Sequence, residues 1–331
     1  MSLIGAFSVL FGMILGCGGI TSKTPQWPKS KQIAGKAQGL SHISALVVDD
    51  KFAYVVIGGT VADQREGNSG LRKVALDSGA VASLDNGENM PQSENGGLAV
   101  DDKFIYWNAS GKIWRIGKDG GKAEPVVADH VGIGIDMVVD GEKIYWTNHG
   151  YYSPGSPPSP SPVFMAAKQG GKAEIFAADQ NIPHSLTADE KNIYWVTPTS
   201  IVKKAKAGGE VQTIYQATDK EGVDELTADA ENLYFGFRGA GDSRWNLRKV
   251  SKNGGEPQTL VKNYSLRPVA VDDANIYFFS EDGMFADVLC KVSKTGGEVT
   301  TIDGGYSSGP ITTDKTQVFF AGLDDIFSFQ K

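Results

Sequence analysis

The sequence predicts an all-β fold, a seven-bladed β-propeller of four-stranded antiparallel blades. The first observation is a unit that recurs seven times: a short apolar segment, a polar turn that opens at an aspartate, and a segment rich in β-branched and aromatic residues. The second is the spacing of these aspartates, 52, 39, 49, 40, 43 and 42 residues, because a strand-only unit of ~40 to 50 residues is typical of one propeller blade. The third is an aromatic residue five positions after each aspartate. The aspartates are Asp49, Asp101, Asp140, Asp189, Asp229, Asp272 and Asp314.

Each repeat divides into four expected strands, and the second copy is the clearest case. Its strands are residues 97–100, 104–107, 112–116 and 123–127, and the third alternates polar and apolar side chains as a half-buried strand does. A glycine pair at 120–121 joins the last two strands, because two-residue hairpin turns require positive φ. No such pair is followed by Gly-Lys-Ser/Thr or by a helical pattern, which excludes phosphate-binding loops. The pair recurs at Gly170–Gly171, Gly208–Gly209, Gly254–Gly255 and Gly296–Gly297.

The two ends of the repeat region complement each other. The last copy offers strands at Gln317–Ala321 and Ile326–Phe329 and then stops at Lys331, so one strand is missing. A spare segment, Lys31–Ala37, precedes the first copy. We expect this N-terminal strand to complete the last blade and to close a propeller over residues 31–331. Closure also removes an exposed sheet edge that would pair with other chains.

The first residues indicate export. Leu3–Leu15 is apolar and uncharged, a length that suits a signal peptide better than a membrane span of ~20 residues. Ile14–Cys17 follows it and resembles the bacterial lipobox. The resemblance implies a signal peptide over 1–16, a lipid on Cys17 and a flexible tether over 17–30. Gly18 after the cysteine implies sorting to the outer membrane, with the body facing the periplasm or the cell surface. No Lys or Arg precedes the apolar run, so an ordinary secretory signal or a buried helix remain alternatives.

Composition narrows the possible partners. There are 32 basic and 39 acidic residues, a net charge of −7, and no run of Lys or Arg, so we expect no nucleic acid partner. If Cys17 carries a lipid, Cys290 has no cysteine partner, and its place in an apparent strand predicts a buried apolar residue. We expect a monomer without a cofactor that contacts the membrane only through its lipid.

Irregular loops place any binding site on one face. The turns between strands one and two and between strands three and four share a face of a propeller, and here they are short and uniform. The remaining connections share the opposite face and carry insertions, at residues 58–70, 148–162, 236–246 and 281–287. Binding residues usually lie on variable loops held by a rigid scaffold. The candidate ligand-binding residues are Arg65, His149, Tyr151, Tyr152, Arg238, Arg244 and Trp245.

Each candidate also has a structural interpretation. The large aromatic residues either stack on sugars and anchor partners, or simply cap the ring. The proline-rich stretch 154–162 favours a stiff spacer over a recognition segment. The four histidines lack His-x-His spacing and no Cys-x-x-Cys occurs, so we expect no metal site. An acidic cluster at 219–225 favours a solvated loop over a calcium site.

Catalytic motifs are lacking. The chain contains no Gly-x-Ser-x-Gly elbow. The seven repeat aspartates are best explained as Asx-turn formers, whose side chains bond to the backbone two residues on. The sequence therefore predicts no catalytic residue.

A resemblance to a known family supports the fold. Ile144–Asn148 resembles the repeat of the YWTD propellers of lipoprotein-receptor ectodomains and bacterial secreted proteins, and Tyr106–Trp107 and Tyr194–Trp195 extend the likeness. The chain departs from that family in two ways: Asn148 stands where the motif ends in Asp, and there are seven copies instead of six. Receptor ligand-binding residues therefore cannot be transferred. The whole chain also resembles repeat-bearing lipoproteins of Gram-negative bacteria.

These observations lead to two functional hypotheses. We expect a lipid-anchored envelope propeller that binds a protein or glycan partner on its irregular face. The alternative is a propeller enzyme, a lyase or a glycoside-acting protein, with its site at the central channel. Convergence of three or more charged side chains around the axis would favour the enzyme. The side chains to test are Arg65, His149, His184, Asp224 and Arg238.

Overall fold

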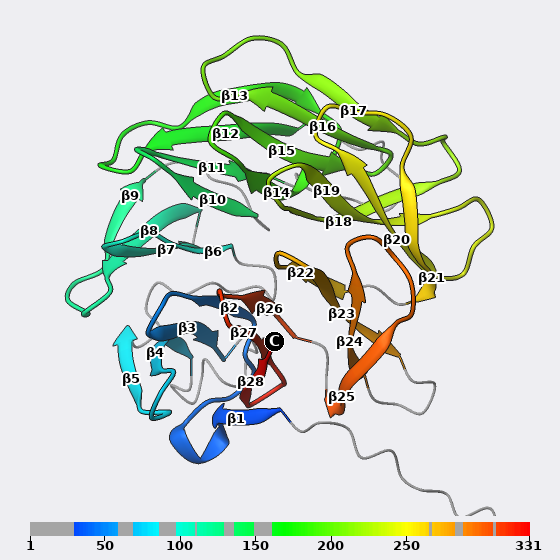
Figure 1. Ribbon diagram of the computed structural model, residues 1–331. Helices are drawn as coiled ribbons and strands as arrows, with labels where there is room; N and C mark the ends of the chain where they lie inside the picture. Colours follow the sequence, from blue (N-terminus) through cyan, green and yellow to red (C-terminus); the bar gives the residue numbers. More distant parts are fainter. Residues whose placement is uncertain are drawn as a thin grey trace, which may run out of the picture.

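Seven four-stranded antiparallel sheets form a ring around a central axis (Figure 1). A computed structural model describes residues 30–58, 69–85, 97–109, 111–128, 136–148, 161–264, 267–281, 287–306 and 309–331. Within each of blades 1 to 6 the strands follow one another in chain order from the axis outwards. The predicted fold class is confirmed.

The strands have the following bounds. Blade 1 contains β2 (Ala45–Val48), β3 (Phe52–Ile57), β4 (Gly70–Ala75) and β5 (Val81–Asp85). Blade 2 contains β6 (Leu98–Val100), β7 (Phe104–Ala109), β8 (Lys112–Gly117) and β9 (Glu124–Val127). Blade 3 contains β10 (Met137–Asp140), β11 (Lys143–Thr147), β12 (Ser161–Ala167) and β13 (Glu174–Gln180). Blade 4 contains β14 (His184–Ala188), β15 (Asn192–Thr197), β16 (Ser200–Ala205) and β17 (Gln212–Gln216). Blade 5 contains β18 (Gly222–Ala228), β19 (Asn232–Arg238), β20 (Trp245–Ser251) and β21 (Gln258–Tyr264). Blade 6 contains β22 (Arg267–Val271), β23 (Asn275–Glu281), β24 (Asp287–Ser293) and β25 (Thr300–Tyr306). Blade 7 contains β26 (Ile311–Thr313), β27 (Gln317–Ala321), β28 (Ile326–Gln330) and β1 (Lys31–Ala34).

The N-terminal strand completes the last blade, as predicted. Strand β1 pairs antiparallel with β28, the last strand of the chain, and forms the outer edge of blade 7. The strand is shorter than the expected segment, because it ends at Ala34 and a 3-10 turn follows over Lys36–Gln38. The side chain of Gln38 accepts a hydrogen bond from the Gly35 amide at 2.9 Å, which starts this turn and ends the pairing.

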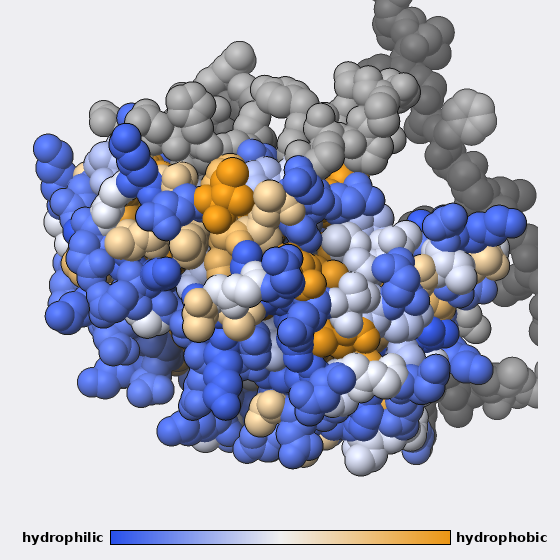
Figure 2. Space-filling model, turned by 90° about the horizontal axis from the view of Figure 1, so that it is seen from above, coloured by the Kyte–Doolittle hydropathy of each residue, from blue (hydrophilic) through white to orange (hydrophobic). Residues whose placement is uncertain are grey.

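Second strands are apolar on both sides because each lies between two neighbouring blades. In β15, Trp195 packs towards blade 3 with Phe176, whereas Tyr194 points the other way and packs against Phe235 of blade 5. Successive side chains of a strand alternate between its two faces, and here both faces are covered. Cys290 is likewise buried, at 2% exposure. The side of the ring that Figure 2 shows is mostly hydrophilic, with smaller hydrophobic groups between the hydrophilic side chains (Figure 2).

Six of the seven repeat aspartates form Asx turns, which confirms their interpretation from sequence for those six; Asp140 is the exception. In Asp101, Oδ1 accepts hydrogen bonds from the amides of Lys103 and Phe104, both at 2.8 Å. The same pair of bonds occurs in five other blades. In blade 3, Gly141 has φ of +54° and lies in a two-residue turn that pairs Asp140 with Lys143. We call the face that carries these turns the first face, and the opposite face the second face.

The same aspartates also join neighbouring blades. The second oxygen, Oδ2, accepts a hydrogen bond from the tyrosine hydroxyl five residues on, at 2.7–3.0 Å in five blades. The same oxygen also forms an ion pair with a lysine of the next blade; for example, Lys118 Nζ lies 2.8 Å from Asp49 Oδ2. The other pairs are Lys168–Asp101, Lys206–Asp140, Lys252–Asp189, Lys294–Asp229 and Lys331–Asp272. Six of the seven seams therefore carry one interblade ion pair of this type.

The seventh seam, between blades 7 and 1, is built differently. Leu76 occupies the position of the lysines, since its amide bonds to Lys51 O as the Lys118 amide bonds to Lys103 O. Phe319 replaces the tyrosine, and Leu76 packs against the apolar cluster that contains it. At this position the seam therefore has apolar packing where the other six seams have an ion pair.

These contacts shift the ionisation of both partners. Burial acts to raise the pKa of each aspartate, but the lysine, the two amides and the tyrosine hydroxyl outweigh it and lower the pKa, to about 2 in Asp101. The pKa is also lowered in Asp49, Asp189, Asp229 and Asp272. Burial, together with the adjacent carboxylate, raises the pKa of the paired tyrosines.

A single seam lysine tests the contribution of these pairs to stability. Lys252 is 7% exposed and its Nζ lies 3.0 Å from Asp189 Oδ2. We expect Lys252→Met to lower the free energy of unfolding by about 1–3 kcal/mol, because it leaves a charge-bonded carboxylate without its cation. Urea unfolding measures the change. Lys220→Met is the matched control at an exposed lysine, with an expected effect within ~0.5 kcal/mol. Equal effects of the two substitutions would contradict a stabilising role for the seam pairs.

Stability should also fall at both extremes of pH. The aspartates have a lower pKa in the folded chain than the value of about 4 in the unfolded chain, so they stabilise the fold at pH values above about 4. This stabilisation is lost as the pH falls through their pKa values in the folded chain. The raised tyrosine pKa values stabilise the fold below about pH 10, and that contribution is lost as pH rises further. Urea midpoints measured from pH 2 to 11 should be lower below about pH 4 and above about pH 10 than at the pH values between them. A protein most stable at pH 3 would contradict this assignment.

Candidate functional site

Three of the predicted ligand-binding residues can be placed, and they lie together in blade 5. Arg238 ends β19, Arg244 lies in the following hairpin, and Trp245 begins β20. We call these three residues the Trp245 edge. The other predicted site residues lie outside the described residues. They are Cys17, Arg65, His149, Tyr151 and Tyr152.

Two glycines make a seat for the Trp245 ring. A β-carbon on Gly222 or on Gly236 would lie 3.4 Å from the ring, so the indole rests directly on the backbone of β18 and β19. The guanidinium of Arg238 stacks over the ring with its Cζ 5.0 Å from the ring centroid. Trp245 also packs against the apolar cluster between blades 5 and 6, which includes Leu247 and Ile276. The ring thus caps this seam and remains partly exposed, combining features of both interpretations from sequence.

The hairpin beside Trp245 presents cations to solvent. Asp242 Oδ2 accepts hydrogen bonds from the Gly239 amide at 3.1 Å and from Asn246 Nδ2 at 3.5 Å, so this carboxylate serves to shape the loop. Arg238 and Arg244 are both exposed, and neither forms an ion pair with any described residue. The result is a positively charged aromatic edge on a chain whose net charge is −7. Such an edge suits an anionic or hydrogen-bonding partner.

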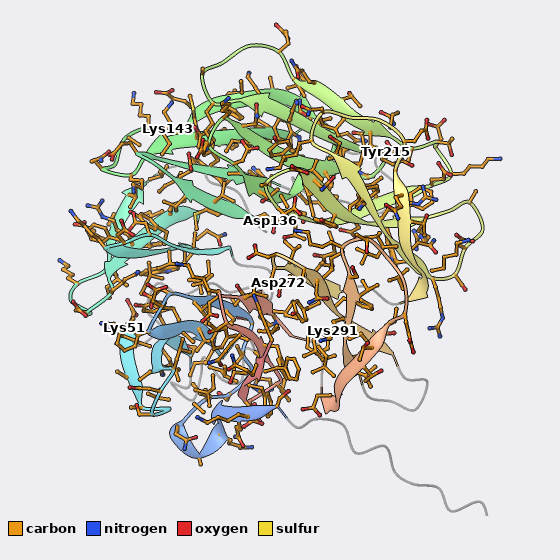
Figure 3. All side chains as sticks on the ribbon, in the orientation of Figure 1. Lys51, Asp136, Lys143, Tyr215, Asp272 and Lys291 are labelled. Atoms are coloured by element: carbon orange, nitrogen blue, oxygen red, sulfur yellow. The ribbon has the colours of Figure 1, made fainter. Side chains whose placement is uncertain are left out.

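A second group of polar residues lies at the second-face ends of the inner strands of blades 3 to 5. It consists of Asp136, His184, Ser185, Asp224 and Glu225, and we call it the His184 cluster. Figure 3 shows Asp136 near the centre of the ring, well inside Lys143 of the same blade. The residues before β10 and at the starts of β14 and β18 therefore meet around the axis (Figure 1).

Two β-bulges shape this cluster. The pairing of β14 with β15 and that of β18 with β19 each gain one extra residue there, between His184 and Thr187 and between Asp224 and Leu226. Ser185 and Glu225 have φ of 52° and 46°, a conformation that residues other than glycine seldom adopt. Strained backbone of this kind is concentrated at functional sites.

Hydrogen bonds connect the three blades across the cluster. Asp136 Oδ2 accepts from the Ser185 amide at 2.6 Å, and Ser185 Oγ accepts from the Leu226 amide at 2.7 Å. His184 Nε2 lies 3.2 Å from Asp224 Oδ1. Burial acts to lower the pKa of His184, but the bond and charge of Asp224 outweigh it and the pKa is raised. His184 and Asp224 were considered from sequence, whereas Asp136 and Ser185 were missed because they break the repeat.

Three of the five side chains named for the enzyme hypothesis are described, and these three do not converge. Only His184 and Asp224 meet, Arg238 lies at the Trp245 edge, and Arg65 and His149 fall outside the described residues. Among the described residues, no group of three or more His, Cys, Asp or Glu side chains is arranged to hold a metal ion. The described part of the chain also contains no helix long and apolar enough to cross a membrane.

Comparisons with known proteins support the fold alone. No family model matches the chain, and no curated protein is recognisably related in sequence. An oligogalacturonate lyase from Vibrio parahaemolyticus has a TM-score of 0.66 at 10% identity, over 88% of this chain and 89% of that one. The computationally designed Ika8 protein has a TM-score of 0.61 at 10% identity, over 91% and 99%. A puromycin-hydrolyzing peptidase from Mycobacterium tuberculosis has a TM-score of 0.65 at 13% identity, over 92% of this chain and 54% of the peptidase, so the chain spans about half of that protein.

Proposed function

We propose that this chain is a lipid-anchored protein of the cell envelope whose propeller binds a protein or glycan partner at the Trp245 edge. The observation that carries the binding role is the seat of Trp245: an aromatic ring fixed on two glycines, with the exposed guanidinium of Arg238 over it. A fixed aromatic group loses little conformational freedom on binding, and Trp and Arg are the residue types most enriched at binding hot spots. The seam contacts make the blades a rigid support for it.

The anchoring part of the proposal rests on the N-terminal sequence. Ile14–Cys17 resembles a lipobox and follows an apolar run of suitable length. A lipid on Cys17 and a tether up to residue 30 would hold the propeller at the outer membrane, on its periplasmic or surface side. The first strand begins at Lys31, directly after that tether.

An enzymatic role is the second candidate. The observation that favours it is the contact between His184 and Asp224 near the axis, where the alternative hypothesis places its site. A lyase and a peptidase also occur among proteins of similar fold. Binding is preferred because the seat of Trp245 is a direct observation in its favour, whereas the Ser185 hydroxyl in the axis cluster accepts the Leu226 amide and so joins two blades.

Substitution at the Trp245 edge tests the binding role. The immobilised full chain is exposed to envelope proteins and to purified envelope glycans, and the retained partner is then titrated. We expect Trp245→Ala to weaken binding at least about tenfold, as is typical of an aromatic hot spot. The matched control is Trp114→Ala, which removes another partly buried tryptophan of a third strand, in blade 2. Equal affinity of the Trp245→Ala variant and the unaltered chain would reject this site.

Replacement of Cys17 tests the anchoring separately. We expect the full chain to sediment with membranes and to be released by detergent, and Cys17→Ser to be found in the soluble fraction, because the thioether that carries the lipid cannot form. Cys290→Ser is the matched control, since that thiol is buried in blade 6 and should leave the protein in the membrane fraction. Membrane association that survives Cys17→Ser would overturn the anchor while leaving the binding role open to its own test.

A further inference from the structure

Both ring nitrogens of His184 face hydrogen-bond acceptors. Nδ1 lies 2.9 Å from the carbonyl oxygen of Ile182, which can only accept, so Nδ1 carries a proton. Nε2 lies 3.2 Å from Asp224 Oδ1. That oxygen also accepts the Glu225 amide at 2.8 Å, a bond that favours the ionised carboxylate. Two acceptors require two donors, so the arrangement holds His184 as an imidazolium.

We propose that His184 is a pH-operated clamp that joins blades 4 and 5 at the second face, closed by the imidazolium and released by the neutral ring. A neutral imidazole has one N–H and can satisfy only one of the two acceptors. Either the bond to Ile182 O or the bond to Asp224 is then lost. The proposal concerns the axis of the ring and does not depend on ligand binding at the Trp245 edge.

Among the described residues, the charged groups around His184 favour the closed state. Strand β18 contributes Asp224, whose Oδ1 lies 3.2 Å from His184 Nε2, and the neighbouring Glu225. Asp136, the residue before β10, contributes a third carboxylate. The partner strand β15 (Asn192–Thr197) contains no charged residue. On β11 the charged residue is Lys143, which pairs with Asp140 at the first-face end, away from the cluster. The carboxylates therefore act against the effect of burial, and the pKa of His184 is raised from its ordinary value.

The backbone around His184 would respond to the loss of a bond. Ile182 has φ of 44° although its side chain is β-branched, and Ser185 and Glu225 are in the same strained region. The Ser185 amide and hydroxyl link Asp136 of blade 3 to Leu226 of blade 5. Release of the imidazole removes a contact that holds these strained turns, so the inner ends of three blades loosen together.

The sign of the pH dependence follows from the direction of the shift. A histidine whose pKa is higher in the folded protein stabilises the fold fully at pH values below about 6.5, the pKa of histidine in the unfolded chain. That contribution is lost as pH rises through the folded value. The clamp is therefore closed in mildly acidic surroundings and opens as the surroundings become alkaline.

Nuclear magnetic resonance of the full chain tests the clamp directly. With ¹⁵N-labelled histidine, the His184 signals are identified by their loss in His184→Gln. We expect both ring nitrogens to be protonated at pH 6 and the titration midpoint to lie above 6.5. Asp224→Asn should lower the midpoint by about one unit or more, because it removes the paired charge. The matched control is Asp219→Asn, an exposed acid in the loop before β18, with an expected shift below about 0.3 units.

Amide hydrogen exchange supplies a readout that a simple structural histidine would not give. The protection factors of the Ser185 and Leu226 amides should fall at the same midpoint as the ring titrates, and this step should move with the midpoint in Asp224→Asn. If that variant does not fold, the unaltered chain still decides the matter through its own midpoint. A neutral His184 ring at pH 6, or amide protection that stays constant through the titration, would overturn the proposal.

Discussion

One carboxylate in each of blades 1 to 6 carries the contact on which the ring depends. The side chain of Asp101 holds its own turn with Oδ1 and uses Oδ2 to bind Tyr106 and Lys168 of the next blade. Because the turn fixes this carboxylate, the incoming lysine must meet it at one position, which sets how two blades lie against each other. The partners are partly buried, so the pair is less screened by water and salt than one on the surface. The same carboxylate thus stabilises both the local turn and the contact between two blades.

The single exception falls at the seam where blade 7 meets blade 1. Leu76 and Phe319 place apolar groups where the other seams have a lysine and, in most blades, a tyrosine hydroxyl. Blade 7 also draws its outer strand, β1, from the other end of the chain and pairs it with β28. Main-chain hydrogen bonds within blade 7, the Ile43 amide bonded to Leu323 O, and apolar packing at the seam with blade 1 together hold the closure.

The two candidate sites of the second face are connected through one glycine. A β-carbon on Gly236 would lie 3.1 Å from the carbonyl oxygen of Asp224 and 3.4 Å from the ring of Trp245. The backbone of β19 therefore lies between the residue that receives His184 and the residue proposed to receive a partner. Packing this tight transmits small displacements, because a close-packed interior has little room to absorb them. Both proposed sites therefore depend on the backbone at the second face of blade 5.

The sequence by itself determined the repeat, the number of blades, the closing strand and the Asx turns, because these depend on period-two alternation and on contacts within a few residues. A lysine two positions before each glycine pair was also visible, yet its partner, 67 residues away in the case of Lys168 and Asp101, was not. Only the tertiary structure decided such pairings, together with the seat of Trp245 and the meeting of His184 with Asp224. These contacts join different copies of the repeat, and the bulged residues Ser185 and Glu225 depart from its pattern. Their geometry comes from the curvature of the ring, which no single copy contains.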